Sequence, residues 1–145
     1  MTAQSHRLTI TELSAREESA VLRVSGELDH HAEPFFLSTL GTSVAAGRVH
    51  LVLDVTALAF CDSRGLNCLL AIRWLLARRG GLLVLSGVGR RLAELLAQTG
   101  STDLLPARRT VAQALADLPE AHRPAWPPHR DGTGAPDTRA PVGEG

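Results

Sequence analysis

The sequence LVLDVTALAFCDSRGLNCLL, residues 51–70, decides the fold of this chain. It opens with a nearly continuous run of Leu and Val, which is typical of a strand covered on both faces. A loop follows, in which we expect Leu58 and Phe60 to point inward, and it ends in Asp62-Ser63-Arg64-Gly65. Beyond it the residues are apolar over most of a helical circumference, which predicts a buried helix from Ser63 to Arg79. A hydroxyl and a carboxylate therefore lie where this strand–loop–helix unit enters its helix.

Two strands and a helix are expected before this unit. Residues 8–13 alternate apolar with polar and residues 20–26 are again strand-like, which predicts a hairpin. Asp29 is a candidate helix cap, and Glu33 and Pro34 suit the first turn of a helix that ends near residue 46. After the unit, the pattern predicts a buried strand, an amphipathic helix, an edge strand and a last helix at residues 82–85, 88–98, 104–105 and 110–118.

The predicted fold class is α/β with α+β character. Strand–helix–strand units require parallel neighbours, whereas the leading hairpin requires an antiparallel edge. We therefore expect a mixed sheet of four to five strands with about four helices, in one domain over residues 1–118 whose first seven residues or so are loose. Residues 119–145 hold six of the eight prolines. We expect them to form a disordered Pro/Gly-rich tail in which Trp126 is loose.

Composition argues against several classes of function. Fifteen basic and fifteen acidic residues cancel, so the chain lacks the positive field that nucleic-acid binding usually requires. No apolar run approaches the roughly eighteen residues of a membrane span, and no apolar signal core is found near the start. These features predict a cytoplasmic protein with neither a nucleic-acid nor a membrane partner. Two cysteines in 145 residues do not make a disulfide scaffold.

Ser63 has two interpretations on sequence pattern alone. Either Asp62 or Ser63 is simply the N-cap of the following helix. Alternatively, the Ser63 hydroxyl is a phosphoacceptor, since the free N–H groups and partial positive charge of a helix N-terminus tolerate a phosphate. The spacing of the residues does not choose between these two readings.

Catalytic and metal sites are poorly supported by the sequence. The Gly-x-Ser-x-Gly pattern of hydrolases is absent around Ser63, although His30 and His31 are available elsewhere in the chain. Cys61 and Cys68 are seven residues apart and lie in apolar surroundings, unlike zinc ligands. We therefore expect a protein that is not an enzyme and that carries no cofactor and no metal.

Two motifs together resemble the signature of bacterial anti-anti-sigma factors, which are built on the STAS domain. The first motif is Gly26-Glu-Leu-Asp-His-His31. The second follows a strand that ends at Asp54 and reads Leu58-Ala-Phe-Cys-Asp-Ser-Arg-Gly-Leu66. The resemblance spans about residues 8–118 and keeps the elements in the same order. It implies a single STAS domain with a non-catalytic role in transcription regulation.

The resemblance also implies a site and its partners. In that family an anti-sigma factor with serine kinase activity phosphorylates the serine after the loop aspartate, which by match is Ser63 after Asp62. Unphosphorylated, such a protein binds the anti-sigma factor and thereby releases a sigma factor; a serine phosphatase reverses the modification. Asp29 falls in the family's partner-binding surface. We expect that surface to contain Asp29, His30, Asp62, Ser63, Arg64 and Gly65.

The sequence departs from the family pattern at one residue of the second motif, and one alternative function stays open. Family members often carry Ser or Thr where Arg64 stands, so this chain places a charge in the middle of the expected interface. The alternative is that the same fold serves as an accessory or sensor subunit of another signalling or transport assembly.

Overall fold

Alternating side chains on three parallel strands build the two faces of the sheet. Residues 2–128, which the computed structural model describes, contain these elements in chain order: β1 (Thr2–Gln4), β2 (Leu8–Arg16), β3 (Ser19–Leu28), α1 (Glu33–Ala45), β4 (His50–Asp54), β5 (Leu58–Cys61), α2 (Ser63–Arg78), β6 (Leu82–Ser86), α3 (Arg90–Gln98), β7 (Ala107–Arg108), α4 (Val111–Leu115) and the 3₁₀ turn η1 (Glu120–His122). The sheet order is β1-β2-β3-β4-β6-β7, and β5 pairs with β3 outside this path.

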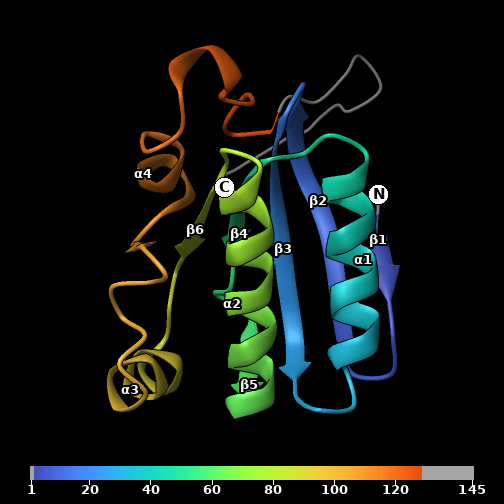
Figure 1. Ribbon diagram of the computed structural model, residues 1–145, viewed down its shortest axis with the longest axis vertical. Coiled ribbons are helices and arrows are strands. Elements are labelled where there is room, and N and C mark those ends of the chain that lie inside the picture. Colours follow the sequence, from blue (N-terminus) through green and yellow to red (C-terminus); the bar gives the residue numbers. More distant parts are fainter. Residues whose placement is uncertain (1, 129–145) are drawn as a thin grey trace, which may run out of the picture.

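The register of the central strands separates two hydrophobic cores. Leu22 of β3 lies beside Leu53 of β4, which lies beside Leu85 of β6, and this row belongs to the larger core under α1 and α2. One residue earlier on each strand, Val21, Val52 and Val84 form the second row, on the opposite face against α4. Successive side chains of a strand point to opposite faces, so the continuous apolar run of β4 serves both cores. Figure 1 shows α1 and α2 in front of the strands.

The predicted fold class is confirmed: the sheet is mixed, with an antiparallel leading hairpin and four α-helices among the described residues. The sheet has seven strands in this part of the chain, more than the predicted four to five. The additional strands β1, β5 and β7 have two to four residues each, too few to show a period of two. The edge strand expected at residues 104–105 instead follows Pro106, as β7.

The prediction of a loose N-terminus is wrong for residues 2–4. β1 pairs antiparallel with β2, with Ala3 beside Ile10, and forms the edge of the sheet. The strand is short and largely polar, so its backbone pairing leaves no hydrophobic pattern in the sequence.

The prediction of a disordered tail is wrong for residues 119–128. These residues include η1, and Trp126 packs against the second core. The prediction relied on composition, and composition does not reveal that one Trp finds an apolar surface on the far side of the sheet. Residues 129–145, the rest of the predicted tail, lie outside the described residues.

Candidate functional site

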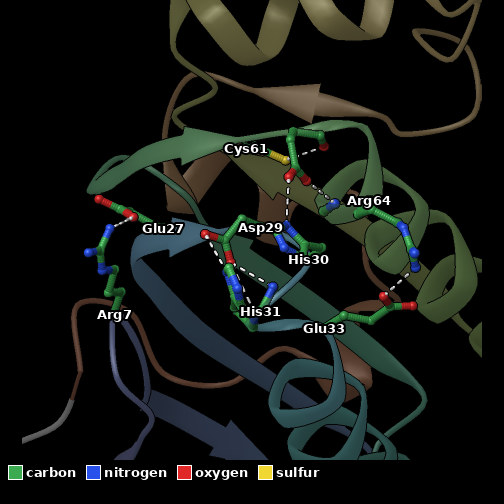
Figure 2. A network of polar contacts seen from close by, with 11 residues as sticks. Arg7, Glu27, Asp29, His30, His31, Glu33, Cys61 and Arg64 are labelled. Atoms are coloured by element: carbon green, nitrogen blue, oxygen red, sulfur yellow. Dashed lines mark hydrogen bonds and ion pairs between the residues drawn. The ribbon is translucent and has the colours of Figure 1, made fainter.

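The pairing of β5 with β3 brings the two sequence motifs together. β3 is ten residues long; its first half pairs with β4 and its last residues pair in parallel with β5. In this register Leu28 lies beside Cys61, so the residues that follow, Asp29 and Asp62, leave the same edge of the sheet next to each other. The structure thus gathers residues more than thirty positions apart into one surface (Figure 2).

The start of α2 shows which of Asp62 and Ser63 caps the helix. Asp62 is the N-cap, and its Oδ1 accepts a hydrogen bond of 2.8 Å from the backbone N–H of Gly65. Ser63 is the first helical residue and is exposed. Within residues 2–128 its hydroxyl makes no hydrogen bond. The capping role therefore belongs to Asp62, and the Ser63 hydroxyl faces solvent.

Gly65 holds the start of α2 against β3. Gly65 is buried, and a Cβ atom there would overlap the backbone carbonyl oxygen of Leu28 and lie 2.9 Å from Cys61 Sγ. Any side chain would force the helix away from the strand. Gly65 therefore fixes how close Ser63 lies to the Asp29 turn, and its own surface is not available to a partner.

Asp29 organises the turn before α1 without being the N-cap of that helix. Its Oδ1 accepts hydrogen bonds from the backbone N–H groups of His31 (3.0 Å) and Ala32 (3.1 Å), whereas α1 begins at Glu33. Burial raises the pKa of Asp29, but the two backbone hydrogen bonds, together with the nearby histidines, outweigh burial and leave the pKa below its ordinary value. A carboxylate with a lowered pKa remains charged at neutral pH and so continues to accept both hydrogen bonds of the turn.

His30 and Arg64 connect the two motifs through side chains. His30 Nδ1 lies 4.0 Å from Asp62 Oδ2, and the His30 ring is stacked at a tilt on the His31 ring. Arg64 donates a hydrogen bond of 3.0 Å to Glu33 Oε1, joining the first turn of α2 to the first turn of α1 (Figure 2). Arg64, the departure from the family pattern, is thus one half of an ion pair between helices.

A shallow cavity of about 490 Å³ lies beside this surface. Among its lining residues are Asp29, His30, Asp62 and Phe60. The Phe60 side chain is 41% exposed, although the sequence places it in the strand–helix loop as an inward residue. That expectation is wrong because the pairing of β5 with β3 shifts register between Leu58, which lies beside Gly26, and Phe60, which lies beside Glu27. The two side chains therefore do not share a face, and Leu58 packs on the core whereas Phe60 does not. Sequence reasoning missed Phe60 as a site residue, because the shift in register that separates it from Leu58 arises in the pairing with β3 and leaves no pattern within β5.

The cysteines beside the site are not reactive thiols. Burial, followed by the carboxylate of Asp62, raises the pKa of Cys61 to about 12, and burial also raises the pKa of Cys68 to about 11. A thiol is nucleophilic and binds metal as its thiolate, which such values suppress at neutral pH. Residues 2–128 contain no cluster of three His, Cys, Asp or Glu side chains placed to hold a metal ion. In the same residues, no helix is long and apolar enough to cross a membrane.

Known proteins share this fold and sequence pattern. The family model for the STAS domain matches residues 11–114. The Anti-sigma F factor antagonist of Paenibacillus polymyxa is 29% identical over 99 residues, which are 68% of this chain and 85% of that protein. The crystal structure of an anti-sigma factor antagonist from Mycobacterium paratuberculosis is 29% identical, with a TM-score of 0.65, and covers 75% of this chain and 93% of that chain.

The fold also occurs inside a larger protein of another kind. The structure of the murine anion transporter Solute Carrier 26 family member A9 is 11% identical, with a TM-score of 0.65 over 77% of this chain and 22% of that chain. At this identity the likeness concerns the fold alone.

Proposed function

This chain belongs to the STAS domain family, and from that premise we propose that it is an anti-sigma factor antagonist whose binding is switched off by phosphorylation of Ser63. The two antagonists with 29% identity support the first half of this proposal. The exposed hydroxyl of Ser63, left free because Asp62 caps the helix, supports the second half. That division of roles between neighbouring residues is the observation that carries the proposal.

A phosphate on Ser63 changes the surface without requiring the helix to unfold. The first turn of α2 presents free backbone N–H groups, which favour an anion. The phosphate adds about −1.5 to −2 charges beside the carboxylates of Asp62 and Glu33. Arg64 is the nearest cation in sequence, and the phosphate competes with Glu33 for it. Phosphorylation therefore both adds negative charge and loosens the ion pair that joins α1 to α2.

The proposed partner is an anti-sigma factor with serine kinase activity. The unphosphorylated surface consists of Asp29, His30, Asp62, Ser63 and Arg64, with Gly65 acting through the packing of the helix. Binding to this surface releases a sigma factor. A phosphate in a packed interface is repelled by like charges and loses its hydration. A combined cost of only ~3 kcal/mol weakens binding by about a hundredfold. A serine phosphatase restores the binding form.

The test is phosphorylation in the presence of ATP and a candidate anti-sigma kinase. Mass spectrometry of the intact chain and of its Ser63 peptide is expected to show one phosphate, at Ser63, and none in Ser63→Ala. Binding of the same kinase is expected to persist in Ser63→Ala and to be lost in Ser63→Glu. Phosphate incorporated into Ser63→Ala, or equal binding by both variants, contradicts the proposal.

The second candidate function is an accessory or sensor domain in a signalling or transport assembly. The occurrence of this fold within an anion transporter favours it. Affinity capture from cells distinguishes the two candidates, because a kinase-like ATPase partner supports the antagonist and a transporter subunit supports the accessory domain.

A further inference from the structure

The last described segment, residues 119–128, forms a strap across the sheet on the side opposite α1 and α2. Ser14 Oγ donates a hydrogen bond of 2.8 Å to the carbonyl oxygen of Ala125, and the Arg16 guanidinium donates one of 3.4 Å to the carbonyl oxygen of Arg123. Trp126 packs on the second core, which contains the row of valines from β3, β4 and β6. The strap lies beyond residues 11–114, the part of the chain that the family model matches.

Two histidines meet where the strap crosses the start of β4. His50 is the first residue of β4 and is 8% exposed; His122 ends η1, and their ring centroids are 5.7 Å apart. Within residues 2–128 neither Nδ1 atom has a hydrogen-bond partner, and neither does the buried hydroxyl of Ser19, the β3 neighbour of His50. A proton on His50 would place a charge without a partner in this buried position, whereas the His122 side chain is 32% exposed.

The charged groups around the pair come from every neighbouring element. The β2–β3 turn supplies Glu17, whose Oε1 lies 3.6 Å from His122 Nδ1, and Glu18, whose charge favours a proton on His50. Three arginines are also found here: Arg16 at the end of β2, Arg48 before β4 and Arg123 in the strap. Each guanidinium group donates a hydrogen bond to a backbone carbonyl oxygen.

Burial lowers the pKa of His50 and the neighbouring His122 lowers it further, against the smaller opposing effect of Glu18. His50 therefore binds fewer protons with the strap closed than with it open. The closed form is favoured above the ordinary value of 6.5 and loses this advantage as the pH falls below that value.

We propose that the strap is a pH-dependent latch, closed on the sheet while His50 is neutral and released when His50 is protonated. Release hydrates the His50 imidazole and uncovers the part of the second core that Trp126 covers. The latch is separate from the Ser63 surface, because the two lie on segments that meet opposite ends of β3.

The experiment uses the full chain with Trp74→Phe, so that Trp126 is the single tryptophan. Acrylamide quenching of Trp126 fluorescence is followed from about pH 8 to about pH 5, with far-UV circular dichroism on the same samples. Quenching is expected to rise reversibly below pH 6.5 while the dichroism stays constant. Absence of a rise, or a rise that only accompanies loss of dichroism, overturns the proposal.

Histidine variants assign the transition to the pair. Adding His50→Gln and His122→Gln together is expected to abolish the rise, whereas adding His6→Gln, at an exposed histidine outside the strap, is expected to keep it. A rise that persists in the double variant overturns the proposal. Because the double variant can fail to fold, the His50 resonances of the Trp74→Phe chain are also titrated by NMR. A midpoint below 6.5 supports the latch, and one at or above 6.5 overturns it.

Discussion

The most constrained single residue of the site is Gly65. A methyl group there would overlap the Leu28 carbonyl oxygen, which belongs to a central strand and cannot move aside. We expect Gly65→Ala to lower the free energy of unfolding by about 2–3 kcal/mol, measured by urea denaturation. The matched control is Gly41→Ala in α1, where the added methyl meets nothing within 4 Å. That change is expected to raise stability by up to about 1 kcal/mol. Equal effects of the two substitutions would contradict the packing role of Gly65.

The division of labour between Asp62 and Ser63 also belongs to the residue scale. Asp62→Ala removes the acceptor for the Gly65 N–H and is expected to cost about 1 kcal/mol of stability. Asp62→Asn keeps an acceptor at the cap and is expected to cost much less. Ser63→Ala is expected to leave stability within about 0.5 kcal/mol of the parent chain, because its hydroxyl faces solvent. Urea denaturation of the three variants decides; a larger loss in Ser63→Ala than in Asp62→Ala would make Ser63 the cap.

Asp29 gives the site a dependence on acid pH. Its pKa lies below the ordinary value of 3.8, so the folded state binds fewer protons there than the unfolded chain. The stability that this carboxylate provides is therefore complete above pH 3.8 and is lost as the pH falls through the lowered pKa. An NMR titration of the side-chain carboxyl is expected to give a midpoint below 3.8. Asp29→Asn is expected to remove that part of the acid dependence, and an unchanged acid profile in this variant would refute the assignment.

At the scale of elements, the site depends on the pairing of β5 with β3, which the sequence did not predict. The hairpin, α2 and the amphipathic α3 were predictable because each spans enough residues to show its period, and β4 was predictable as a continuous apolar run. β5 has four residues, of which the exposed Phe60 breaks the expected pattern. Asp29 and Asp62 were placed on one surface by family resemblance; the physical reason, parallel pairing of Leu28 with Cys61, is a long-range contact without a local signal.

The ion pair between Arg64 and Glu33 joins α2 to α1, and the sequence alone did not predict it. Both groups are partly exposed, so their coupling is expected to be about 0.2–1 kcal/mol and to weaken with salt. A double-mutant cycle with Arg64→Ala and Glu33→Ala, measured by urea denaturation at low and high salt, tests this value. The surface pair Arg90 and Glu94, within α3, serves as a control that does not cross between elements. If the two substitutions show no coupling energy at low salt, the ion pair does not stabilise the contact between the helices.

At the scale of the whole molecule, the sheet is a two-sided structure, and its two sides differ in how far the sequence reveals them. The larger core was predictable from the apolar helix α2 and from the Leu and Val run of β4, and Phe36 of α1 is buried in it. The second core is completed by α4 and by Trp126, which lies in a segment whose prolines indicate disorder. Composition measures how much apolar surface a segment carries, whereas docking depends on the surface that the rest of the fold offers to it.

The two tryptophans of the chain provide the test of this view. Trp126 lies on the second core, whereas Trp74 is 58% exposed on α2 with the Arg78 guanidinium 4.7 Å from its ring centroid. At about pH 8, where the strap is closed, Trp126→Ala is expected to lower the free energy of unfolding by about 1–3 kcal/mol. The substitution removes the apolar contacts that Trp126 makes with the second core. Trp74→Ala is expected to change it by about 0.5 kcal/mol or less. Urea denaturation of both variants separates the cases: if Trp126→Ala is as mild as Trp74→Ala, the strap does not contribute to the stability of the domain.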